Sequence, residues 1–91
     1  MPAIEVETTT LGEVETAVAA GVEIIMLDNM PPDLMKTAVQ RIRQANSRIR
    51  IEASGNVTLE TLEAIARTGV DYISTSATIT RAPWLDLSMR L

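Results

Sequence analysis

The sequence has no cysteine and no histidine, and its only aromatic residues are Tyr72 and Trp84. These absences exclude disulfides, thiolate chemistry, a Ser-His-Asp triad and the usual zinc ligands. Carboxylates are the strong metal ligands that remain. The scarcity of aromatic rings leaves few surfaces on which the bases of single-stranded nucleic acid could stack.

The sequence also lacks a basic cluster and a long apolar run. Its eight Lys and Arg residues are spread along the chain and the net charge is −4, so we expect no nucleic-acid partner. No apolar run approaches the roughly 18 residues that a membrane span needs, and no basic-then-apolar leader opens the chain. We therefore expect no membrane association and take a cytoplasmic location as the default.

The length and composition describe one small soluble domain. Hydrophobic residues make up 46% of the 91 residues and charged residues 22%, which argues against disorder. At this size about 60 to 65% of the unfolded surface can be buried, and no second core is available. We expect residues 1–91 to form a single domain.

Four short aliphatic segments alternate with three helical patterns. The predicted strands are Ile4–Glu7, Val22–Leu27, Ile49–Ala53 and Val70–Ser74. The first predicted helix begins after a cap within residues 8–10 and is closed by Gly21, and the second starts at Pro31 or Pro32 and runs to about Gln44. The third is capped by Thr58 and stopped by Gly69. In the third helix we expect a buried face of Leu59, Leu62, Ile65 and Ala66.

This order predicts an α/β fold with a parallel sheet and right-handed crossovers. Four parallel strands with three helices form about half of an eight-stranded barrel, so we expect a partial (β/α) barrel. The tail, Leu85–Leu91, suits either a strand or a helix. Because a half barrel has open edges and an exposed inner face, we expect a homo-oligomer.

Two acidic residues stand at the ends of the first two predicted strands. Glu7 and Asp28 should meet at one edge of the sheet, where α/β proteins keep their active sites. Together they could bind a hydrated divalent ion or hydrogen-bond the vicinal hydroxyls of a sugar. The alternative is that each side chain caps or solvates a loop. A third acid, Glu52, points either into the barrel interior or toward the helices.

Two polar loops follow the third and fourth strands. Ser54, Gly55 and Asn56 precede the third helix, where backbone N–H groups could bind a phosphate. Ser74, Thr75 and Ser76 would lie beside them at the same edge and complete an anion site. The alternative is that both are ordinary loops, since one glycine is a weak motif.

Five segments together resemble the C-terminal third of quinolinate phosphoribosyltransferase. They are Ile4–Glu7, Ile25–Met30, Ile51–Gly55, Val70–Ser74 and Leu85–Ser88. Their order and spacing agree with the family across essentially the whole chain.

The resemblance implies a reaction of NAD biosynthesis. In it, quinolinate and phosphoribosyl pyrophosphate give nicotinate mononucleotide, pyrophosphate and carbon dioxide, with Mg²⁺ as cofactor. By the resemblance, Glu7 and Asp28 would contact the ribose hydroxyls and the magnesium-bound substrate. Ser54, Gly55 and the loop 74–76 would hold the 5′-phosphate.

The chain departs from the family pattern in two ways. Asn56 and Ser76 stand where the family has glycines, and Arg81 stands where it has histidine. Family members are also about three times longer, and the missing part supplies the basic residues that bind quinolinate and pyrophosphate. We therefore expect the isolated chain to be inactive. The alternatives are a self-associating half barrel without chemistry and a phosphate-binding module.

Overall fold

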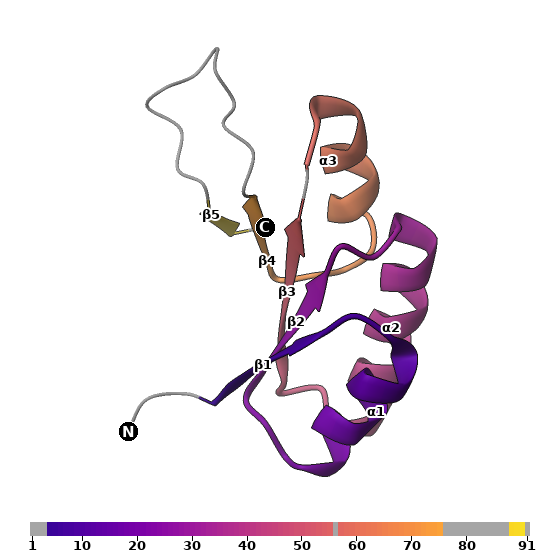
Figure 1. Ribbon diagram of the computed structural model, residues 1–91, viewed down its shortest axis with the longest axis vertical. Coiled ribbons are helices and arrows are strands. Elements are labelled where there is room, and N and C mark those ends of the chain that lie inside the picture. Colours follow the sequence, from indigo (N-terminus) through magenta and orange to yellow (C-terminus); the bar gives the residue numbers. More distant parts are fainter. Residues whose placement is uncertain (1–3, 56, 76–87, 91) are drawn as a thin grey trace.

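A computed structural model describes residues 4–55, 57–75 and 88–90 (Figure 1). The elements follow one another in the order β1 (Glu5–Thr8), α1 (Leu11–Ala19), β2 (Ile24–Asp28), α2 (Pro32–Ala45), β3 (Arg50–Gly55), α3 (Leu59–Ala66), β4 (Tyr72–Thr75) and β5 (Ser88–Arg90). The predicted α/β fold, with four parallel strands and three helices, is confirmed.

The strands form one sheet whose spatial order follows the chain, β1-β2-β3-β4-β5. The first four strands are parallel, and β5 pairs with β4 in the antiparallel direction. Crossovers of one hand between successive strands put every helix on the same side of a sheet. Figure 1 shows this arrangement, with α1, α2 and α3 on one face and, among the described residues, no helix on the other. The described part of the tail, left open by the sequence, is a strand.

Local signals at the helix starts explain where each helix begins. The Thr10 hydroxyl caps α1 by accepting from the Glu13 N–H, and the Glu13 carboxylate accepts from the Thr9 N–H and hydroxyl, both at 2.7 Å. The hydrogen bonds to the carboxylate lower the pKa of Glu13. The largest effect comes from the Thr9 N–H and the next from the Thr9 hydroxyl. Helix α2 starts at Pro32, whose fixed φ suits a first helical turn.

The core lies between the helices and one face of the sheet. Side chains alternate along each strand, and those that face the helices are buried. Ile25, Leu27, Ile51 and Ala53 are fully buried beneath the helices. Each fully buried Ile or Leu contributes about 1.5–3 kcal/mol. None of the helices in the described ranges is long and apolar enough to cross a membrane.

The predicted face of α3 is partly wrong. Ile65 is buried and Leu62 half-buried, but Ala66 is exposed and Leu59 is 74% exposed. Leu59 is the first residue of α3, so its spacing fits the buried face although the side chain is exposed at the start of the helix. The predicted strands also begin one or two residues early, because Val22 and Val70 are buried in the turns before β2 and β4.

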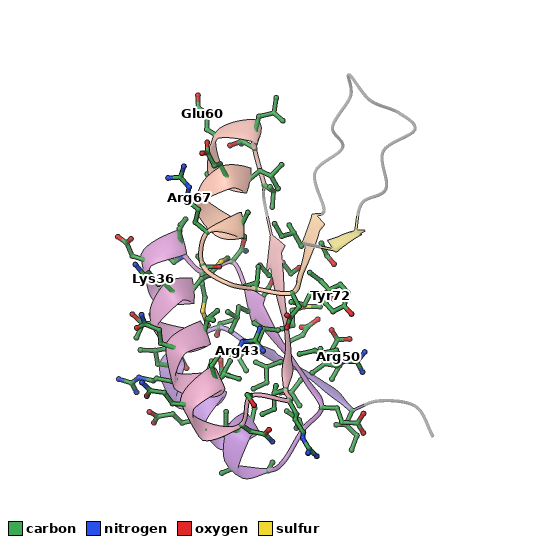
Figure 2. All side chains as sticks on the ribbon, turned by 180° about the vertical axis from the view of Figure 1, so that it is seen from behind. Lys36, Arg43, Arg50, Glu60, Arg67 and Tyr72 are labelled. Carbon is green, nitrogen blue, oxygen red and sulfur yellow. The ribbon has the colours of Figure 1, made fainter. Side chains whose placement is uncertain are left out.

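An arginine near the end of α2 joins three segments at the amino-terminal end of the sheet. Arg43 donates through Nη1 to the Ile49 carbonyl at 2.8 Å and through Nη2 to the Asp71 carboxylate at 2.9 Å. Its Nη2 also donates to the Gly69 carbonyl at 3.2 Å. The same Asp71 oxygen accepts from the Ile51 N–H at 2.9 Å. Figure 2 shows Arg43 between the helix layer and the sheet. We call this network the Arg43 clamp.

Replacing Arg43 with alanine should lower the free energy of unfolding by about 2 kcal/mol, since hydrogen bonds to charged groups contribute about 1.5–3 kcal/mol and this pair is about one-third exposed. Arg67, which pairs with Glu63 on the exposed face of α3, is the matched control. Arg67→Ala should cost about 0.5 kcal/mol or less. Urea unfolding measures both. Equal losses would contradict a structural role for the clamp.

Candidate functional site

The carboxyl-terminal edge of the sheet brings three predicted site residues into one row. Asp28 is in register with Ser54, and Ser54 with Ser74, across β2, β3 and β4. Neighbouring strands are about 4.8 Å apart, so these side chains are direct neighbours. All three are half-buried and alternate with the core residues, which puts them on the helix-free face.

Glu7 lies one row further from this edge. It is in register with Met26 on β2, two residues before Asp28, so Glu7 and Asp28 are diagonal neighbours on the same face. Glu7 is exposed and Asp28 half-buried. The row of Glu7 continues through Met26 to Glu52 and Tyr72. Glu52 therefore faces away from the helices, which resolves the two orientations left open by the sequence.

The helix-free face carries an excess of negative charge. Glu5, Glu7, Asp28 and Glu52 lie on it, while Arg50 shares the row of Glu5 and Arg90 is in register with Tyr72 in the row of Glu7. Figure 2 shows Arg50 and Tyr72 on the side of the sheet opposite the helices. Although Glu5 is largely exposed, its partial desolvation raises its pKa, and repulsion from Glu52 and Glu7 adds to the effect. The ionised carboxylates of Glu5, Glu7 and Glu52 thus repel one another on this face.

The described residues contain two carboxylates suited to an indirectly held cation. In residues 4–55, 57–75 and 88–90, no group of three acidic side chains converges to hold a metal ion. Mg²⁺ usually keeps several waters and uses one or two carboxylates together with substrate phosphates. Glu7 and Asp28, as diagonal neighbours, provide two such hard oxygen ligands. The donor set fits Mg²⁺ held partly by a substrate.

Gly55 and Asn29 contact each other where β2 and β3 end. Gly55 has φ +136°, a conformation that side chains rarely adopt, and a Cβ there would lie 2.5 Å from Asn29 Oδ1. The Asn29 N–H donates to the Ser54 carbonyl at 2.8 Å. The sequence analysis did not name Asn29 as a site residue. An asparagine directly after a predicted strand could have indicated a turn with positive φ, because asparagine tolerates that conformation.

Helix α3 begins at Leu59, three residues after Asn56, and its capping hydrogen bonds use some of the N–H groups at its amino terminus. The Thr58 hydroxyl accepts from the Thr61 N–H at 3.2 Å, and the Thr61 hydroxyl accepts from the Thr58 N–H at 2.9 Å. These two N–H groups are therefore engaged within the protein. An anion at this helix end has to rely on the remaining N–H groups of the first turn and on the loop before it.

A pocket of about 290 Å³ lies where β2 and β3 lead into α2 and α3. Its polar lining includes Asn29, Ser54 and Thr61, and its apolar lining includes Met35, Val57 and Ile65. Ser54 and Gly55 thus line this cavity at the end of β3, although the register puts the Ser54 side chain on the helix-free face. A lining that combines polar and aliphatic groups suits a ligand with both polar and apolar parts.

Three predicted site residues are described in part or not at all. Asn56 and Ser76 lie outside the described residues, and for Thr75 the structure describes the backbone. The backbone of Thr75 is in register with Gly55, so the fourth strand ends beside the predicted phosphate loop. Arg81 and Trp84 also lie outside the described residues.

The chain is similar to known enzymes along nearly its whole length. It is 71% identical over 89 residues to a probable nicotinate-nucleotide pyrophosphorylase [carboxylating] of Synechocystis sp., covering 98% of this chain and 30% of that protein. It is 44% identical over 86 residues to the probable enzyme of the same name from Bacillus subtilis, covering 94% of this chain and 29% of that protein. The chain thus spans about 30% of the length of these curated relatives.

Solved structures and a family pattern agree with these matches. The nicotinate-nucleotide pyrophosphorylase of Francisella tularensis superposes with a TM-score of 0.72 at 41% identity, covering 80% of this chain and 25% of that one. The family described as quinolinate phosphoribosyl transferase, C-terminal domain, matches residues 1–90. Since the match takes in every described strand and helix, the chain belongs to the quinolinate phosphoribosyl transferase family and corresponds to its C-terminal domain.

Proposed function

We propose that this chain provides the ribose-phosphate-binding part of a quinolinate phosphoribosyltransferase. The observation that carries the proposal is the row formed by Asp28, Ser54 and Ser74 on the helix-free face. One carboxylate and two hydroxyls side by side suit a sugar phosphate, because they can accept from ribose hydroxyls and donate to phosphate oxygens. The family membership supplies the reaction, in which quinolinate and phosphoribosyl pyrophosphate form nicotinate mononucleotide.

Glu7 and Asp28 are the proposed catalytic residues of this part. Their carboxylates would accept hydrogen bonds from the ribose hydroxyls and stabilise the positive charge that develops on the ribose as pyrophosphate leaves. Both would also help to hold the proposed cofactor, Mg²⁺, through the bound substrate. Mg²⁺, when bound, neutralises negative charge on the pyrophosphate.

The 5′-phosphate is proposed to bind at the ends of β3 and β4. The binding residues are Ser54, Gly55 and Asn56 from the first loop and Ser74, Thr75 and Ser76 from the second. Gly55 supports this role because a residue without a side chain lets a ligand approach the backbone closely. The pocket beside Ser54 and Gly55 supports it further.

The described site lacks the cations that a dicarboxylate and a pyrophosphate need. The described rows of its helix-free face contain four acidic residues against two arginines, Arg50 and Arg90. We therefore propose that the remaining two-thirds of a longer family member supplies basic groups and completes a barrel around this face. For the chain alone, we propose self-association through the free edge of β1 and the half-buried Ile24 and Met26. A cytoplasmic location is part of the same proposal.

The purified chain should form no nicotinate mononucleotide from quinolinate, phosphoribosyl pyrophosphate and Mg²⁺, because the groups that bind the two polyanions are missing from the described site. Light scattering on the same sample should give the mass of a dimer or larger assembly. Turnover at the rate of an ordinary phosphoribosyltransferase would contradict the assignment of a partial site. A monomer at micromolar concentration would contradict self-association.

Millimolar ribose 5-phosphate should raise the melting temperature of the wild-type chain by several degrees, since ligand at ten times its Kd adds about 1.4 kcal/mol. Gly55→Ala should abolish this rise and lower stability by about 2 kcal/mol, because the new Cβ would meet Asn29. Gly12→Ala is the matched control, since a Cβ there meets nothing closer than 3.9 Å. Equal ligand responses in both variants would remove Gly55 from the site.

Glu5→Gln should raise the melting temperature at pH 7. The pKa of Glu5 is raised in the folded chain, so folding disfavours its ionised form at pH values above the folded pKa. The gain should shrink as the pH falls through the folded pKa and disappear below the ordinary pKa of 4.5, where the carboxyl is protonated in both states. Thermal unfolding from pH 3 to pH 8 measures it, and a gain independent of pH would contradict a raised pKa of Glu5 in the folded chain.

A further inference from the structure

We infer that Asn29 is a positioning residue that holds the turn of Ser54 and Gly55 in its ligand-binding conformation. This inference rests on the proposed function, since the turn is the proposed 5′-phosphate site. Asn29 itself need not touch the phosphate. It acts through its neighbour strand, by one backbone hydrogen bond and one side-chain contact.

The backbone of Asn29 has an unusual conformation. Its φ is +53°, the one positive value among the non-glycine residues of the described ranges. Asparagine tolerates this left-handed conformation better than most residues. The Asn29 N–H donates to the Ser54 carbonyl, at 2.8 Å, as the last hydrogen bond of the parallel ladder between β2 and β3. The hydrogen bond thus fixes the peptide that joins Ser54 to Gly55.

The side chain of Asn29 lies against the next residue of that turn. A Cβ on Gly55 would lie 2.5 Å from Oδ1 and 3.3 Å from both Cα and Cγ of Asn29. The amide therefore fills the space where a side chain at position 55 would begin. Gly55, at φ +136°, belongs to the residue type with the widest conformational freedom. Contact with the amide limits that freedom on one side.

The two contacts have a common consequence at the pocket. Asn29, Ser54 and Gly55 all line the same cavity of about 290 Å³. Without the amide, Gly55 would gain room to move toward the vacated space, and its backbone would be less ordered before ligand arrives. Ordering a loop on binding reduces affinity. The side chain, and not merely the positive φ, should therefore set the affinity.

Asn29→Gly separates these two contributions, because glycine keeps the positive φ without strain but removes the amide. Asn46→Gly is the matched control. Asn46 caps the far end of α2 and accepts from the Arg48 N–H at 3.0 Å, so it also loses a local contact. Both variants and the wild-type chain are titrated with ribose 5-phosphate while their ¹H–¹⁵N spectra and melting temperatures are recorded.

Asn29→Gly should weaken ribose 5-phosphate binding about tenfold. It should shift the amide signals of Ser54 and Gly55 and leave the signals of the Arg43 clamp in place. Asn46→Gly should retain the affinity and both signals. Asn29→Asp, which has the same shape and also tolerates positive φ, should keep the Gly55 signal near its wild-type position.

Two results would overturn the inference. One is Asn29→Gly with wild-type affinity and an unmoved Gly55 signal, which would mean that positive φ alone is required. The other is an equal loss of affinity in Asn46→Gly, which would point to general destabilisation. If the wild-type chain does not bind ribose 5-phosphate, the proposed function fails for this chain. The spectra then decide the inference, and an unmoved Gly55 signal in Asn29→Gly rejects it.

Discussion

The register of the parallel sheet is the constraint on which the rest of this structure depends. Because side chains alternate along a strand, a shift of one residue would turn the aliphatic set outward and the acidic set into the core. The observed register puts Ile25, Leu27 and Ile51 beneath the helices. The same register aligns Asp28 with Ser54 on the opposite face. Burial of the core and assembly of the candidate site are thus consequences of one alignment.

The two faces of the sheet differ in burial and charge. On the helix face, the aliphatic side chains are covered by α1, α2 and α3. The other face keeps carboxylates near one another, and the pKa of Glu5 is raised first by partial desolvation and then by repulsion from Glu52 and Glu7. Repulsion of this kind is relieved by a cation, by protonation or by basic side chains. The face is therefore best suited to a setting in which positive charge approaches it.

Much of the fold could be predicted from the sequence because periodic patterns reflect periodic burial. The alternation of strands and helices gave the parallel sheet, and the end of each strand gave the edge where Asp28, Ser54 and Ser74 meet. Periodicity could not place Leu59, because the first residue of a helix can be exposed even where its spacing fits the buried face. It also could not reveal the contact of Asn29 with Gly55. That contact depends on backbone angles of two residues that are far apart in the chain.

Burial at the strand starts limited the prediction in another way. Val22 and Val70 continue the aliphatic pattern of β2 and β4 but belong to buried turns. An apolar residue in a turn can be buried in the core just as one in a strand can. The apolar pattern therefore does not show at which residue the hydrogen bonds between strands begin. The predicted strands were therefore right in number and order and displaced at their first residues.

The Arg43 clamp lies at the amino-terminal end of the sheet, while the candidate site lies at the carboxyl-terminal end. Stabilising and ligand-binding groups in α/β folds often divide in this way. One consequence concerns how the sequence can diverge over time. Loops that follow β3 and β4 begin at the opposite end of the sheet, so residues there can be exchanged without disturbing the clamp. The anchored end thus gives the loops at the candidate site freedom to vary while the fold is inherited unchanged.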